Sequence, residues 1–171
     1  MLKSIQLSIV ERRLLSALLN GLKSGDAPTA KNIREIRRRL DLRLADHVIE
    51  GLNELTEEFT QKISWESFAD PDEVISEFQE LLEKADPSDA SKLQKVLDAL
   101  KEVLVYKEFT MDEVYLNWLK TVANEKDWSK VNVQQRDGSV TEQQIVPSYG
   151  ILMIFADTLE ALDNAKFVEK G

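Results

Sequence analysis

Residues 7–22 read LSIVERRLLSALLNGL, and this segment carries the clearest secondary-structure pattern of the chain. Its leucines recur every three or four residues, which is the spacing of one face of an amphipathic helix. Ser8 and Glu11 stand three residues apart at its start, as in the capping box of a helix N-terminus. The segment therefore predicts a helix that begins near Ser8 and buries a wide leucine stripe.

Similar start signals recur along the chain. Asp70-Pro71 and Asp86-Pro87 each place a capping aspartate before a proline that suits the first helical turn. Thr110 and Glu113 have the spacing of another capping box. These signals and the apolar spacing predict helices that begin near residues 8, 29, 44, 70, 86, 110 and 147. We therefore expect a mainly α fold, a compact assembly of six to eight helices.

Three segments carry more specific expectations. The helix over residues 44–59 should bury one apolar stripe, made of Leu44, Val48, Leu52, Leu55 and Phe59. The last helix, from Pro147 to about Ala165, is the most apolar segment and should be the most buried. In residues 60–68, Ile63 and Trp65 alternate with polar residues, which leaves a short strand or a loop open.

One small β-hairpin is expected near residues 130–146. Val131 and Val133 alternate with polar residues, and the tight-turn pair Asp137-Gly138 follows before Val140. Alternation on both sides of an Asp-Gly pair is typical of two antiparallel strands joined by a tight turn. The hairpin completes the predicted fold class.

The 171 residues suit about one domain, and the net charge is −9. Residues 1–60 hold 10 basic and 9 acidic side chains, whereas residues 61–171 hold 12 and 22. We therefore expect an Arg-rich three-helix unit over residues 1–60 and an acidic helical region with the hairpin over residues 70–171, joined in one body. No apolar run approaches the roughly 20 residues of a membrane span, so a cytoplasmic protein without membrane contact is expected.

The three helices expected over residues 7–55 follow the order of a helix-turn-helix domain. Basic side chains gather on and after the second of them, and they are candidate contacts for nucleic acid or for a partner: Lys31, Arg34, Arg37, Arg38 and Arg43. The third helix would have to enter the major groove, yet it carries Asp46, Glu50 and Glu54. A three-helix packing unit with a solvated basic face is therefore preferred to a DNA-binding domain.

The same region resembles the start of short, uncharacterised phage-encoded proteins. Residues 9–40 share with them an E-R-x-L-L run, a short loop and a T-x-K-x-x-R-x-x-R helix. The matching positions are Glu11-Arg12, Leu14-Leu15, Leu18-Leu19, Gly25, Thr29, Lys31, Ile33-Arg34 and Ile36-Arg37. Asn20-Gly21-Leu22-Lys23 replaces the proline and lysine usual in that loop. The resemblance implies a phage or mobile-element origin, and it says nothing about activity.

Residue types used in catalysis are scarce. The chain has no cysteine, which excludes thiol catalysis and cysteine-ligated metals, and its one histidine, His47, lies on a polar helix face. The Asp-Pro clusters lack the glycine of a calcium loop, and no Gly-rich phosphate loop or Gly-x-Ser-x-Gly occurs. We therefore predict neither catalytic residues, nor a metal, nor a cofactor, while a site made only of carboxylates stays open.

Two tryptophans in polar contexts, Trp65 and Trp128, would either fill grooves of their own fold or anchor a partner. Together with the acidic second part, they favour a small, acidic, non-enzymatic protein that acts through protein–protein contact. A DNA-binding or transcription-regulatory protein that uses the Arg-rich second helix is the alternative, and DNA mimicry by the acidic part is a third. The partner's identity and homo-oligomer formation stay open.

Overall fold

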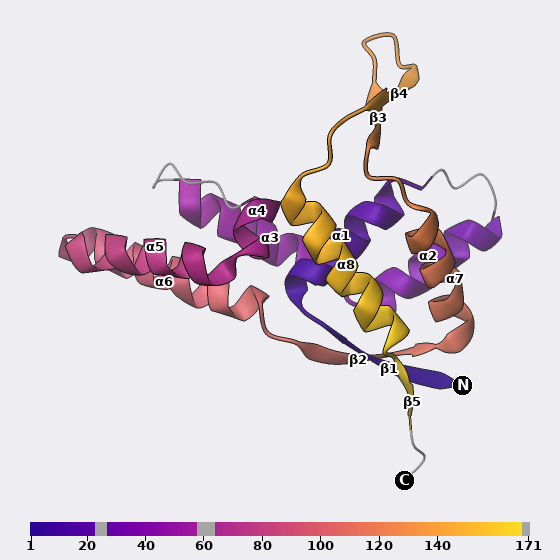
Figure 1. The fold of residues 1–171 in the computed structure, drawn as a ribbon, viewed down its shortest axis with the longest axis horizontal. Helices are drawn as coiled ribbons and strands as arrows, with labels where there is room; N and C mark the ends of the chain where they lie inside the picture. The colour runs from indigo at the N-terminus through magenta and orange to yellow at the C-terminus, as the bar shows by residue number, and fades with distance from the viewer. Residues whose placement is uncertain (23–26, 58–63, 169–171) are drawn as a thin grey trace.

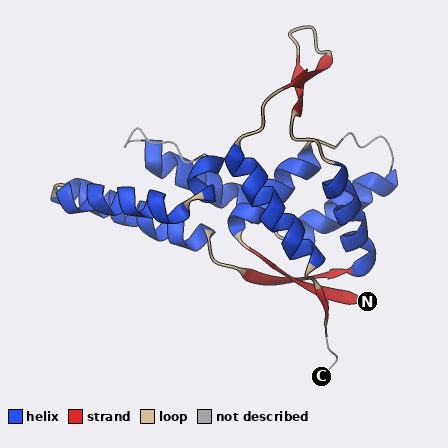
Figure 2. Ribbon diagram, viewed as in Figure 1, coloured by secondary structure: helices blue, strands red, loops and turns tan. Residues whose placement is uncertain are grey.

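The computed structural model describes residues 1–22, 27–57 and 64–168, and within them the chain is mainly α-helical (Figures 1 and 2). The elements follow in the order β1 (Leu2–Leu7), α1 (Ile9–Asn20), α2 (Ala27–Arg39), α3 (Leu42–Glu57), α4 (Trp65–Ala69), α5 (Pro71–Lys84), α6 (Pro87–Val103), β2 (Lys107–Asp112), α7 (Glu113–Glu125), β3 (Lys130–Gln134), β4 (Val140–Gln144), α8 (Tyr149–Asp163) and β5 (Lys166–Phe167). The predicted fold class is confirmed. Gly25 of the family pattern and Phe59 of the predicted stripe lie outside the described residues.

Local capping sets the helix starts that the sequence predicted. The backbone N–H of Glu11 donates to Ser8 Oγ at 3.2 Å, and the backbone N–H of Ser8 donates to Glu11 Oε1 at 3.0 Å. Asp70 and Asp86 cap α5 and α6, each accepting from a backbone N–H three residues on. These contacts satisfy donors that a helix N-terminus otherwise leaves unpaired.

A second sheet, which the sequence analysis missed, runs beneath the helices. Strand β1 pairs antiparallel with β2 from Leu2↔Asp112 to Leu7↔Lys107, and with β5 on its other edge. Thr110 therefore lies in a strand, and the capping box predicted there is wrong. Helix α7 begins at Glu113, where Asp112 Oδ1 accepts from the backbone N–H of Val114 at 3.0 Å.

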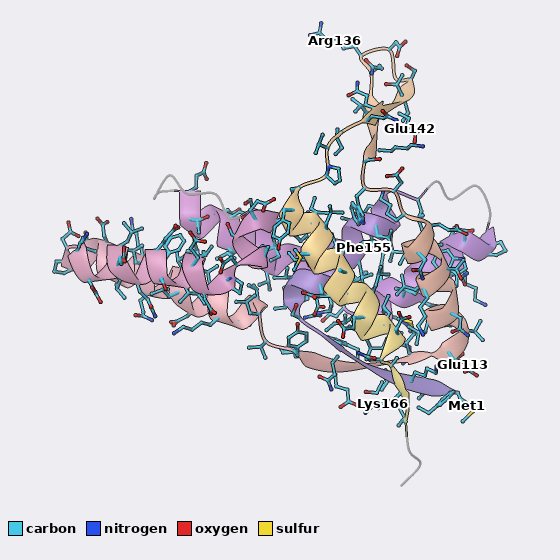
Figure 3. All side chains as sticks on the ribbon, in the orientation of Figure 1. Met1, Glu113, Arg136, Glu142, Phe155 and Lys166 are labelled. Carbon is cyan, nitrogen blue, oxygen red and sulfur yellow. The ribbon has the colours of Figure 1, made fainter. Side chains whose placement is uncertain are left out.

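The predicted hairpin is confirmed as β3 and β4, which pair antiparallel from Lys130↔Gln144 to Gln134↔Val140. Gly138 takes a φ of +86° in the turn, a backbone conformation that side chains other than glycine rarely adopt. The hairpin extends away from the helices, and Arg136 lies at its tip (Figures 1 and 3).

Trp65 lies in the short helix α4, so the strand or loop expected there is corrected for residues 65–68. The backbone N–H of Ser67 donates to Ser64 O at 3.1 Å, and that of Ser64 donates to Ser67 Oγ at 3.3 Å. A helical turn satisfies these polar groups locally, and a period-2 pattern over a few residues is too short to exclude it.

The buried stripe of α3 also differs from the prediction. Leu44 is 43% exposed and Leu55 is 37% exposed, whereas the buried residues are Leu42, Ala45, Ile49, Leu52 and Thr56. Asp41 takes a φ of +49°, and this left-handed residue lets the helix begin at Leu42, two residues before the predicted start. Helix α3 packs against α1, and the residues that it buries lie next to the predicted stripe on the helix surface.

Helix α8 is less buried than its composition predicted. One face contacts α1, α4 and α7 and buries Gly150, Ile154, Thr158 and Leu162. Leu152 and Met153 point away from that face and are exposed. Among the residues that the structure describes, the buried side chains form two apolar clusters, and α1 and α8 contribute to both. These two helices therefore join the sheet side of the molecule to the α5–α6 side.

Candidate functional site

The predicted basic face of α2 is present and mostly exposed. Lys31, Arg34 and Arg38 are exposed, and Arg37 is half-buried. Arg38 pairs with Glu35 of its own helix at 2.8 Å, and Arg37 donates a hydrogen bond to Asn20. Two of the predicted cations therefore already have protein partners, which leaves Lys31 and Arg34 as the more accessible charges of this face.

Arg43, the fifth predicted contact, lies at the start of α3. It lines a shallow depression of about 410 Å³ with Asp41, Leu44 and His47. Further along the same helix, Glu50 and Glu54 are exposed, as the sequence analysis expected. Cations and carboxylates therefore alternate on this surface, which is unfavourable for a phosphate backbone.

Arg12 is a structural residue that the sequence analysis did not single out. It is 1% exposed, its guanidinium donates to Leu40 O at 3.0 Å and to Asp41 O at 3.3 Å, and it lies 4.5 Å from the centroid of the Phe109 ring. Arg12 thus fixes the turn between α2 and α3. Its spacing of three residues from Leu15 was the signal for a buried position.

Trp65 and Trp128, the predicted partner anchors, are both half-buried against the core clusters. The Trp128 ring packs edge-on against the Phe155 ring, with 5.3 Å between the ring centroids. Lys126 Nζ lies 5.0 Å from the centroid of the Trp128 ring. Trp65 packs edge-on against Phe68 at 6.3 Å. Each indole fills a groove of its own fold, and only part of it is accessible to another molecule.

The strongest charge asymmetry lies on residues 70–89, here termed the acidic arm. This segment comprises α5, the turn after it and the start of α6, and the α5–α6 hairpin extends away from the rest of the molecule (Figure 1). The acidic arm holds one base, Lys84, and eight acids. All eight acids are exposed: Asp70, Asp72, Glu73, Glu77, Glu80, Glu83, Asp86 and Asp89. Buried Phe78 anchors α5 among the side chains that hold the hairpin together.

Crowding of charge is visible at the base of this arm. The pKa of Glu73 is raised, first by a hydrogen bond shared with the Asp70 side chain and then by the negative charges of Asp70 and Glu77. The neighbouring carboxylates that raise the pKa of Glu73 create a negative potential that a basic surface would relieve.

A cavity of about 560 Å³ lies between α1, α8 and the three-stranded sheet. Its walls include Glu11, Tyr106, Asp157 and Glu160. Lys166, which also lines the cavity, lies on β5 (Figure 3). Burial raises the pKa of Glu11, and the charge of Asp157 raises it further. Burial also raises the pKa of Tyr106, with added effects from Glu11 and Asp157. These residues are far apart in the sequence, and the sequence analysis did not find this site.

Comparisons with protein-family models, curated proteins and solved structures found no match to this chain. Over residues 1–22, 27–57 and 64–168, no three His, Asp or Glu side chains are placed so that they could hold a metal ion. None of the helices in this described part combines the length and apolar character that crossing a bilayer requires. The candidate sites are therefore judged on their own geometry.

Proposed function

We propose that this protein is non-enzymatic and binds a protein partner that carries a basic surface, with the acidic arm as its contact. One observation carries the proposal: residues 70–89, the first helix and the turn of a projecting helical hairpin, hold eight exposed carboxylates against a single lysine. Complementary charge raises the rate of association and selects against acidic partners. A hairpin with its own apolar seam holds those charges in fixed positions, which lowers the entropic cost of binding.

Apolar contact would add affinity to this electrostatic attraction. Leu81 is exposed on the arm between Glu80 and Glu83 in the sequence, and it offers a partner an apolar contact within the charged segment. Trp65 and Trp128 are both half-buried in their own fold, so only part of each indole is accessible to a partner.

The test uses a fluorescently labelled decalysine peptide and measures anisotropy between about 50 and 200 mM salt. The variant Glu73→Gln/Glu77→Gln/Glu80→Gln/Glu83→Gln removes four charges from the arm. A matched control removes four exposed charges elsewhere, through Glu50→Gln, Glu54→Gln, Glu125→Gln and Glu142→Gln. We expect the arm variant to weaken binding about tenfold or more and the control to weaken it less than about threefold. Equal losses would show that only net charge matters and would overturn the proposal.

A second function, DNA binding by α2, is favoured by the exposed side chains of Lys31, Arg34 and Arg38 on one helix. The test is binding to a fluorescent random duplex across the same salt range, with Arg34→Ala/Arg37→Ala/Arg38→Ala as the variant. Steeply salt-dependent binding that this variant loses would support DNA contact. No binding at low salt would exclude it and would leave these arginines as a solvated face.

A further inference from the structure

The cavity beside Glu11 contains a buried carboxylate that the fold does not satisfy. Glu11 is 4% exposed, and its Oε1 accepts the capping hydrogen bond from the backbone N–H of Ser8. Its Oε2 is buried and has no hydrogen-bond partner among the described residues. A buried acceptor without a donor costs free energy, and the cost is larger when the group is charged.

Helix capping does not explain why this residue is charged. In a capping box, glutamine at the third helical position serves as well as glutamate, because only a side-chain oxygen is needed to accept from the cap residue. A glutamine would make the same contact with Ser8 without burying a negative charge. The charge of Glu11 is therefore an independent feature of the cavity.

The rest of the cavity adds to that negative charge. Asp157 and Glu160 of α8 lie on the same walls, and Lys166 is the one basic side chain among the residues that line it. The volume of about 560 Å³ lies in the range of small-ligand sites. No residue of the acidic arm lines this cavity, so it is a separate site from the surface proposed above.

We propose that this cavity binds an organic cation with a primary ammonium group on an alkyl chain, whose N–H groups donate to the carboxylates of Glu11 and Asp157. The described residues include no carboxylate cluster suited to a metal ion, which favours a larger cation. Ala161 and the ring of Tyr106 provide apolar surface for the alkyl chain. Entry of a cation relieves the repulsion between Glu11 and Asp157, which line the same cavity.

The ammonium group could be carried by a free diamine or by a lysine side chain, and the experiment separates the two. Isothermal titration calorimetry would compare 1,5-diaminopentane, N-acetyl-lysine methylamide and the uncharged 1,5-pentanediol. We expect saturable binding of at least one amine and none of the diol. The tighter amine identifies the source. Failure of both amines to bind up to about 10 mM, or equal binding of the diol, would overturn the proposal.

Variants locate the binding site. Glu11→Gln keeps the capping oxygen, and Asp157→Asn changes an exposed carboxylate, so both should fold. Each should weaken amine binding about tenfold. The matched control, Glu80→Gln, removes one charge from the acidic arm and should change binding less than about twofold. A loss in Glu80→Gln equal to the loss in Glu11→Gln would mean nonspecific attraction to an acidic protein, and would overturn the assignment to the cavity.

Discussion

Replacing Arg12 with alanine should destabilise the protein strongly, although Arg12 and Arg13 are neighbours of the same type. Arg12 is 1% exposed, and its guanidinium binds the carbonyl oxygens of Leu40 and Asp41 at the turn between α2 and α3. Arg13 is 32% exposed and makes an ion pair with Asp46 at 3.3 Å. The structure therefore assigns one arginine to the interior and the other to the surface.

The magnitude follows from the contacts of Arg12. Each hydrogen bond from its charged guanidinium to a backbone carbonyl, one buried and one partly buried, contributes about 2 kcal/mol. Its approach to the Phe109 ring at 4.5 Å adds about 1 kcal/mol. Removing the residue also relieves its buried Nε–H, which has no partner among the described residues, and this returns about 2 kcal/mol. The net loss is about 3 kcal/mol, which corresponds to a fall in Tm of roughly 6–12 °C.

Urea denaturation followed by circular dichroism measures the free energy of unfolding of both variants. Arg13→Ala should lose about 1–2 kcal/mol, because the ion pair is partly exposed but the variant leaves the buried Oδ1 of Asp46 without a partner among the described residues. Asp46 also keeps its hydrogen bond from Ser16 Oγ at 2.8 Å in that variant. If the two variants lose the same free energy within about 0.5 kcal/mol, the assignment of Arg12 as the residue that fixes the turn is wrong.

Two further predictions concern α8, α3 and α1. Gly150→Ala should lower the free energy of unfolding by about 3 kcal/mol, because its Cβ would lie 2.2 Å from the backbone carbon of Trp65. Gly51→Ala should raise the free energy of unfolding by about 0.5–1 kcal/mol, since no atom of the described residues lies within 4 Å of the added Cβ. Denaturant midpoints would separate the two variants, and equal effects would contradict the prediction. The pKa of Glu11 is raised in the folded state from its ordinary value of 4.5. The wild-type protein should therefore lose stability as the pH rises from 4.5 through this raised pKa. Glu11→Gln should lose less over that range, and parallel stability–pH curves would contradict this.

The features that the sequence predicted correctly depend on neighbouring residues. A capping box or an Asp-Pro start joins groups within four residues, so Ser8, Asp70 and Asp86 could be read as caps directly. The Asp137-Gly138 turn is equally local. The missed β1–β2 pairing joins Leu2–Leu7 to Lys107–Asp112, and no pattern in either short segment identifies a partner so distant in the chain.

The candidate sites also separate into those formed by neighbouring residues and those formed by tertiary packing. Helical spacing places Lys31, Arg34 and Arg38 on one face of α2, and that face is exposed. The ion pair of Arg38 with Glu35 adds a local contact that the sequence analysis did not consider. The cavity unites Glu11 with Asp157, which tertiary packing alone brings together. A search of the sequence for spaced carboxylates has no means of finding such a site.

Glu11 and Arg12 show how the fold distinguishes a structural charge from one that it does not explain. Both are buried, and both lie in the first turns of α1. Two carbonyls and an aromatic ring inside the protein contact the guanidinium of Arg12, and only its Nε–H lacks a hydrogen-bond partner among the described residues. Among the described residues, no group donates a hydrogen bond to Glu11 Oε2, and glutamine would cap the helix equally well. The contacts of the fold explain the buried charge of Arg12, whereas the proposed cationic ligand explains the buried charge of Glu11. Glu11→Gln should therefore raise the free energy of unfolding at neutral pH and weaken amine binding, which is the trade-off expected of a binding residue.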